Sequence, residues 1–137
     1  MDVENALYPG RSRIEALMAD ASDAPVVMLN LLRFRVNAAY PDGRPSDLTG
    51  RQAYGLYAAA MQKVIDERGG RVLFSGDVAS LVIGDVEDIW EACVLVEYPS
   101  AAAFAAIVTS PEVAEIGVHR AAGLEGQLLI RVTQRAL

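Results

Sequence analysis

Helix-start signals placed between apolar segments constrain the fold of this chain more than any other feature of its sequence. Thr49-Gly50-Arg51-Gln52 has the form of a capping box, and apolar residues then recur at helical spacing to about residue 67. Gly69-Gly70 ends this predicted helix in the manner of a C-terminal glycine cap. Ser100, and then Ser110 followed by Pro111, mark a second helical region that runs to about residue 122.

Four apolar segments around these helices have the length and the residue content of strands. They cover approximately residues 26–35, 71–83, 89–98 and 128–133. Short acidic and glycine-containing sequences separate the middle two segments, which predicts a hairpin-type connection and antiparallel pairing. The resulting order, β-α-β-β-α-β, predicts an α+β fold of the ferredoxin-like kind, a four-stranded antiparallel sheet with both helices on one face.

The residues before the first strand predict a short additional helix. Ser12-Arg13-Ile14-Glu15 has the S-x-x-E form of a capping box, and the apolar spacing that follows favours a helix over residues 13–21. We therefore expect residues 1–24 to form an N-terminal helical extension and residues 25–137 to form one domain. Residues 37–50 are predicted to be a loop, and loops of this length are uncommon unless they are functional or mobile.

Composition excludes some partners and favours self-association. The net charge of −6 and the pI of about 4.7 repel nucleic acids and anionic lipid surfaces. No segment resembles a membrane span or a signal peptide, so we expect no membrane partner and a cytoplasmic location. Because 53% of the residues are hydrophobic, we expect the sheet face without helices to be covered by a second copy in a homodimer.

Six motifs in this order resemble an uncharacterised bacterial family of the dimeric α/β-barrel superfamily, known only as a domain of unknown function. They are MLNLLRFR, GRQAY, GGRVLFSG, IW, VEYPS-x-x-x-F and SPE…HR…LE, and the resemblance covers about residues 25 to 133. It implies that two ferredoxin-like subunits pack their sheets face to face and enclose a cavity, either between sheet and helices or within the shared barrel. The superfamily includes cofactor-free monooxygenases, haem-degrading enzymes, isomerases, polyketide cyclases and dehydratases, so the fold alone selects no reaction.

The haem-degrading branch of this superfamily is the sharpest comparison. Asn30 matches its first-strand asparagine, whereas Ile107 and Gly117 stand where the resemblance places its tryptophan and histidine. Haem degradation is therefore disfavoured, and we expect no cofactor.

Asn30 interrupts an apolar strand, and a buried amide left unpaired costs about 1–3 kcal/mol. Strand alternation places Asn30 on one face with large apolar side chains, those of Val26, Met28, Leu32 and Phe34. Two interpretations follow. In the first, the amide orients a ligand in an apolar pocket; in the second, the backbone or a buried water satisfies it.

His119 is the only histidine, and histidine is the side chain that titrates near neutral pH without perturbation. In an enzyme, His119 would move a proton while Asn30 or an arginine stabilises an enolate, and Arg120 would fix a carboxylate. The alternative is a solvent-facing helix end, where a histidine and an arginine are favoured by the helix dipole.

Six further residues are candidate substrate-binding residues. Arg33 would bind a carboxylate, Ser75 would donate a hydrogen bond, and four aromatic residues would line a pocket for a flat substrate: Tyr54, Tyr57, Trp90 and Tyr98. The alternatives are a salt bridge for Arg33, a tolerated bend at Ser75 and core packing for the aromatic residues. One histidine and one cysteine cannot form a structural zinc site, so we expect no metal.

Two functions remain open at this point. The first is a cofactor-free enzyme of the isomerase, cyclase or monooxygenase type that acts on a small cyclic or aromatic acid or ketone. The second is a non-catalytic small-molecule-binding or oligomeric accessory protein. The first requires His119 and Asn30 to meet at one cavity.

Overall fold

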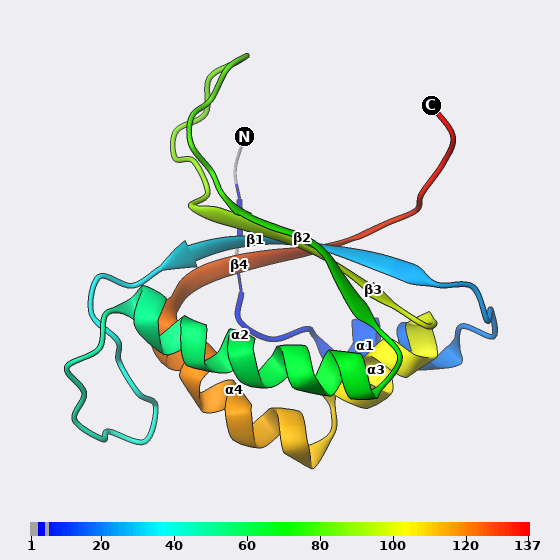
Figure 1. The fold of residues 1–137 in the computed structure, drawn as a ribbon, viewed down its shortest axis with the longest axis horizontal. Helices are drawn as coiled ribbons and strands as arrows, with labels where there is room; N and C mark the ends of the chain where they lie inside the picture. The colour runs from blue at the N-terminus through cyan, green and yellow to red at the C-terminus, as the bar shows by residue number, and fades with distance from the viewer. Residues whose placement is uncertain (1–2, 5) are drawn as a thin grey trace.

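The computed structural model describes residues 3, 4 and 6–137, which form a four-stranded antiparallel sheet with helices on one face (Figure 1). The strands lie in the order β2-β3-β1-β4, so the ferredoxin-like α+β fold predicted from the sequence is confirmed. The elements in chain order are α1 (Arg11–Ala19), β1 (Val26–Phe34), α2 (Gly50–Glu67), β2 (Arg71–Asp77), β3 (Ala92–Tyr98), α3 (Ala101–Val108), α4 (Pro111–Gly123) and β4 (Leu124–Val132).

The predicted capping signals of α2 and α4 are confirmed. Thr49 accepts a hydrogen bond from the backbone of Gln52 at 3.1 Å, and the Gln52 side chain accepts one from the Thr49 backbone at 2.9 Å. Ser110 accepts a hydrogen bond from the backbone of Val113 at 3.3 Å, with proline in the first turn. These caps fix where the two helices begin above the sheet.

The predicted capping box of α1 is wrong. Gly10 is the N-terminal cap, with no side-chain cap hydrogen bond, and the helix begins at Arg11. Ser12 therefore lies inside the first turn, and Glu15 pairs with Arg11 at 2.9 Å instead of capping the helix. The S-x-x-E pattern by itself did not locate the start, since glycine is also a favoured cap.

The two middle strands pair antiparallel as predicted, but both are shorter than predicted and the connection between them is longer. A backbone hydrogen bond from Val78 to Glu91, at 2.9 Å, closes a long excursion of residues 78–91, which we call the arm. Its apolar side chains are solvent-exposed in the single chain: Leu81, Val82, Ile83, Val86 and Ile89. The arm rises from the sheet on the side opposite the helices (Figure 1).

The last strand begins four residues earlier than predicted. β4 pairs with β1 from Leu124 onward, opposite Phe34, whereas apolarity alone placed the start at Leu128. The register shifts near this end, between Arg33 and Phe34, which is the mark of a bulge. The earlier start brings Gln127 into the sheet.

A close approach of α2 and α4 holds the helical layer together. A Cβ atom at Gly123 would lie 2.4 Å from the carbonyl oxygen of Gly50, so only glycine fits there. The main core lies between this layer and the sheet, and it includes Met28, Ile65 and Phe104.

Among the described residues, no single helix is both long and apolar enough to cross a membrane. The helices α3 and α4, which meet at a bend, reach such a length and apolarity only when the two are taken together.

Candidate functional site

A cavity lies between the sheet and the helices. It has two lobes, of about 250 and 560 Å³. Six of the residues that line the first lobe also line the second: Asn30, Tyr57, Met61, Tyr98, Arg120 and Gln127. We call the two lobes together the central cavity. Its size lies within the range of small-molecule sites, which extends from about 300 to 1,000 Å³.

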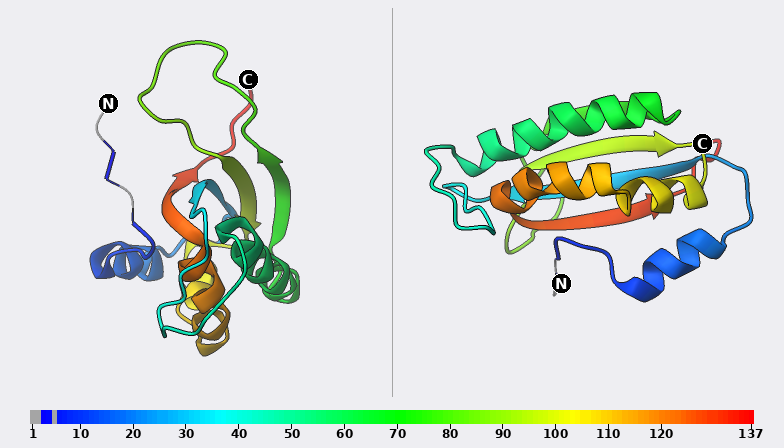
Figure 2. Two further views of the ribbon diagram at one scale, coloured as in Figure 1. Left: turned by 90° about the vertical axis from the view of Figure 1, so that its left-hand side faces the viewer. Right: turned by 90° about the horizontal axis from the view of Figure 1, so that it is seen from below.

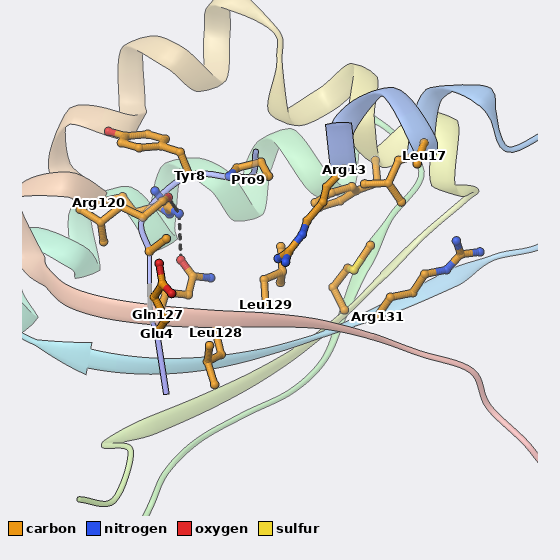
Figure 3. Close-up of a pocket in the computed structure, with 15 residues that line it drawn as sticks. Glu4, Tyr8, Pro9, Arg13, Leu17, Arg120, Gln127, Leu128, Leu129 and Arg131 are labelled. Carbon is orange, nitrogen blue, oxygen red and sulfur yellow. Dashed lines mark hydrogen bonds between the residues drawn. The ribbon is translucent and has the colours of Figure 1, made fainter. Parts of the chain in front are cut away.

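A third cavity, of about 390 Å³, continues from the central cavity along β4 and α1 (Figure 3). It shares Tyr8, Arg120 and Gln127 with the larger lobe. Residues 6–9, which precede α1, lie beside the edge strand β4 and form one wall of this cavity (Figure 2).

Three side chains form a directed series of hydrogen bonds inside the central cavity. Arg120 donates from Nη2 to Oε1 of Gln127 at 2.9 Å, and Gln127 donates from Nε2 to Oδ1 of Asn30 at 2.8 Å. Asn30 in turn donates from Nδ2 to the backbone carbonyl of Val94 at 3.2 Å. Asn30, Gln127 and Arg120 are therefore joined in one hydrogen-bonded series.

Asn30 is held mainly by the protein itself. Its amide nitrogen points to the backbone carbonyls of Val94 and, at 3.5 Å, of Met28, while its oxygen accepts from Gln127. The backbone therefore satisfies the donors of the Asn30 amide, as the second of the two interpretations expected. The second lone pair of Oδ1 is the polar point that Asn30 can still offer to a ligand.

Gln127 was not among the residues singled out from the sequence. It is the only buried polar side chain among the described residues, with 8% of it exposed, and it joins Asn30 to Arg120. The signal that could have located it is the one that located Asn30, an amide next to an apolar run. The late predicted start of β4 had placed Gln127 outside the strand.

Arg120 is half-buried and has only neutral partners. Besides Gln127, its Nη2 donates to the backbone carbonyl of Leu7, and its guanidinium lies 5.3 Å from the centre of the Tyr8 ring. No carboxylate forms an ion pair with it in the described part of the chain. No acidic side chain among the described residues lines the central cavity either.

Three tyrosines of the central cavity were predicted as substrate-binding residues: Tyr54, Tyr57 and Tyr98. Burial raises the pKa of each phenol, against a small lowering of the pKa of Tyr54 and Tyr57 by the charge of Arg120. No protein atom in the described residues hydrogen-bonds their hydroxyls, although no fully buried polar atom lacks a partner. The hydroxyls are therefore neutral polar groups at the cavity surface.

Ser75 also lines the smaller lobe, whereas three predicted site residues, Arg33, Trp90 and His119, lie elsewhere. Arg33 pairs with Asp88 at 3.0 Å and stacks on Trp90 at 4.9 Å, and neither Arg33 nor Trp90 lines any of the three cavities. These two residues therefore do not join the tyrosines at one site.

His119 lies on α4 but lines none of the three cavities. A hydrogen bond of 2.7 Å joins its Nδ1 to the hydroxyl of Tyr40, in the loop before α2. The structure does not bring His119 and Asn30 together at one cavity, and a catalytic role for either stays a prediction. Within the described residues, no group of three or more His, Cys, Asp or Glu side chains is placed to hold a metal ion.

Comparisons with known proteins agree with the fold. Residues 44–132 match the family described as a domain of unknown function, DUF1330. The crystal structure of the RPA0582 protein of unknown function from Rhodopseudomonas palustris is 32% identical in sequence, with a TM-score of 0.85, over 98% of this chain and 100% of that one. The structure of methylated RPA0582 is 34% identical, with a TM-score of 0.85, over 96% of each chain. No curated protein matches the sequence.

Proposed function

This chain belongs to the DUF1330 family of domains of unknown function, and from that premise we propose that it binds a small, largely apolar acid in the central cavity. The carboxylate of the ligand binds the guanidinium of Arg120. The observation that carries this proposal is that Arg120 lines the cavity with only neutral partners among the described residues.

The electrostatics of the cavity support an anionic ligand. A charge removed from water costs free energy unless an opposite charge or several hydrogen bonds compensate it. Arg120 donates hydrogen bonds to one amide oxygen and one backbone carbonyl, and both are weaker acceptors than a carboxylate. A ligand carboxylate would supply the missing charge, and Gln127 keeps the guanidinium oriented for it.

The walls of the cavity support a cyclic or aromatic ligand body. Tyr54 and Tyr57 stand with ring centres 5.6 Å apart, and Tyr98 packs against Phe104 at 4.8 Å. Flat aromatic side chains give large contact areas to flat ligands, and the neutral hydroxyls offer hydrogen bonds to a second oxygen. The ligand class is therefore a small cyclic or aromatic acid, or a ketone in its anionic enol form.

Binding without catalysis is better supported than a cofactor-free isomerase, cyclase or monooxygenase. The ionisable side chains that line the central cavity are tyrosines and Arg120. Neither type accepts a proton near neutral pH, because a phenol and a guanidinium already carry their protons there. A general base works best with a pKa close to the working pH, so neither type fits this role. His119, the group that would fill this role, lies outside the cavity.

We also propose that the functional unit is a homodimer that pairs the helix-free faces of two sheets. One row across this face is made of apolar residues that are register partners on successive strands: Phe74, Leu95, Leu29 and Ile130. Phe74 is 56% exposed and Ile130 is 41% exposed in the single chain, and the apolar arm stands beside them. A second copy presents the same apolar row and arm, which makes it a matching partner.

The test of the binding proposal uses a charged probe and its neutral analogue, 2-naphthoate and 2-naphthamide. We expect the unaltered protein to bind 2-naphthoate more tightly than 2-naphthamide in a fluorescence titration. In Arg120→Gln the affinity for 2-naphthoate should fall by about 1.5–3 kcal/mol, which is roughly ten- to a hundredfold, while that for the amide changes little.

The matched control is Arg68→Gln, which removes an arginine that pairs with Glu112 at 3.1 Å and lines none of the three cavities described above. Its affinities should equal those of the unaltered protein. Equal loss of 2-naphthoate binding in both variants, or equal affinity of the unaltered protein for both probes, would contradict the proposal.

A further inference from the structure

We propose that the N-terminal residues 6–9, which we call the strap, regulate the proposed site by competing with the ligand for Arg120. This inference rests on the proposed function. In the structure, the strap makes the contact with the guanidinium that an anionic ligand would make. The strap is therefore an autoinhibitory segment that the ligand displaces.

The strap makes two contacts with the guanidinium of Arg120 (Figure 3). The backbone carbonyl of Leu7 accepts a hydrogen bond from Nη2, and the ring of Tyr8 lies beside the guanidinium at 5.3 Å. A carbonyl oxygen is a neutral counterpart of a carboxylate oxygen, and an aromatic face attracts a cation. Both interactions use the guanidinium that would bind the carboxylate of a ligand.

The strap also stands in the wall of the cavity. Tyr8 and Pro9 line both the larger lobe of the central cavity and the third cavity beside it. Displacement of these two residues would join the two spaces more widely, on the side where Arg120 is located. The strap residues that contact the charged group of the site therefore also form the wall between the two cavities.

The attachments of the strap are few enough to be exchanged. The backbone of Ala6 donates to the carbonyl of Gln127 at 3.4 Å, and Tyr8 is 65% exposed. Leu7 packs against a small cluster that contains Leu32 and Leu124, and this is its apolar anchor. Because charge-assisted hydrogen bonds are roughly twice as strong as neutral ones, a carboxylate is the stronger partner for Arg120.

Competition fixes the sign of the effect that the strap has on affinity. A ligand that must displace a segment binds with an apparent affinity lowered by the fraction of protein in which the segment is bound. Weakening of the strap should therefore tighten ligand binding. A segment that closes over the ligand as a lid would give the opposite sign, because its contacts would add to binding.

The experiment measures 2-naphthoate binding to full-length Tyr8→Ala, with full-length Val3→Ala as the control. Val3 belongs to the same N-terminal segment, is 47% exposed and lines none of the three cavities. We expect Tyr8→Ala to bind 2-naphthoate about two- to fivefold more tightly, the equivalent of one exposed cation–π contact, and Val3→Ala to be unchanged. An unchanged or weaker affinity in Tyr8→Ala would overturn the competition.

Hydrogen exchange of the peptide that covers residues 3–10 is a second readout, which needs no substitution. Saturation with 2-naphthoate should accelerate exchange in this peptide, since the ligand releases the strap, and slower or equal exchange would overturn the inference. Failure of the proposed function is distinguishable, because then 2-naphthoate binds neither the unaltered protein nor Tyr8→Ala. That outcome would overturn the strap inference together with the proposed function.

Discussion

Two adjacent rows of residues cross the same four strands and face opposite sides of the sheet. The row toward the helices consists of register partners that line the cavities: Ser75, Val94, Asn30 and Leu129. The row toward the other side, one residue away along each strand, is entirely apolar: Phe74, Leu95, Leu29 and Ile130. Helices of the same chain cover the first row and no helix covers the other (Figure 1), although in both rows the end residues are exposed and the middle residues are half-buried.

The difference between the rows separates two functions within one sheet. A polar residue in the middle of a covered row needs internal partners, and Asn30 obtains them from Gln127 and the backbone. An uncovered row without any polar residue has no such requirement, but it loses free energy while water covers it. We therefore propose that the helix-facing row serves a ligand and that the other row serves a second copy of the chain.

The largest expected effect comes from a charge placed in the helix-free row. Leu29→Glu puts two carboxylates, one from each protomer, into the centre of the proposed interface, and like charges there cost several kcal/mol. We expect the dimer to dissociate at least about a thousandfold more readily. Native mass spectrometry and light scattering across a concentration series measure this change.

The control for Leu29→Glu is a charge on the same chain away from that face, Ala106→Glu on the exposed side of α3. It should leave the subunit count unchanged. A monomeric unaltered protein at every accessible concentration would break the comparison itself, because the uncovered row would then have no partner.

The tyrosines on the helix side give the next largest effect, in alkaline solution. Burial raises the pKa of Tyr54, Tyr57 and Tyr98 above the value of about 10 found in unfolded chains. The folded protein then holds protons that the unfolded chain releases, so their contribution to stability is complete below pH 10 and is lost as the pH rises further. Each group should lower the free energy of unfolding by up to about 1.4 kcal/mol per pH unit while it stays protonated in the folded state.

Urea denaturation at pH 8, 10 and 11 measures this loss. Tyr54→Phe keeps the ring and removes one ionisable group, so its stability should fall less steeply above pH 10 than that of the unaltered protein. Identical slopes in the two proteins would mean that water reaches the Tyr54 hydroxyl freely in the folded state.

The sequence predicted the sheet and its main helices because each has a local chemical signature. The capping box at Thr49 and the Ser110-Pro111 pair fix helix starts within one turn of the chain, and the two-residue alternation of β1 fixes which face Asn30 occupies. The ends of β2 and β4 have no such signature. Where a strand stops depends on whether a neighbouring strand continues to pair with it, which is a property of tertiary structure.

The candidate site was predicted in part for the same reason. Asn30 and the tyrosines could be placed from their own elements, whereas the partner of Arg120 could not. Arg120 and Gln127 are seven residues apart in sequence but lie on a helix and a strand that meet only in the folded chain. The position of His119 depends on the conformation of the 37–49 loop, for which sequence gives no periodic signal.

The smallest expected effect concerns the hydrogen bond between Asn30 and Gln127, which holds the central polar residue of the covered row in place. Asn30→Ala and Gln127→Ala should each lower the free energy of unfolding, and the double variant should lower it by less than the sum of the two. The difference, measured by urea denaturation as a double-mutant cycle, should be about 0.5–1.5 kcal/mol, the net value of one buried hydrogen bond. Asn30→Ala should weaken 2-naphthoate binding less than Arg120→Gln does, because its amide donors serve the backbone. A zero coupling energy together with a large loss of binding in Asn30→Ala would mean that the amide binds the ligand directly. The main role of Asn30 in the covered row would then be ligand binding and not stabilisation of the fold.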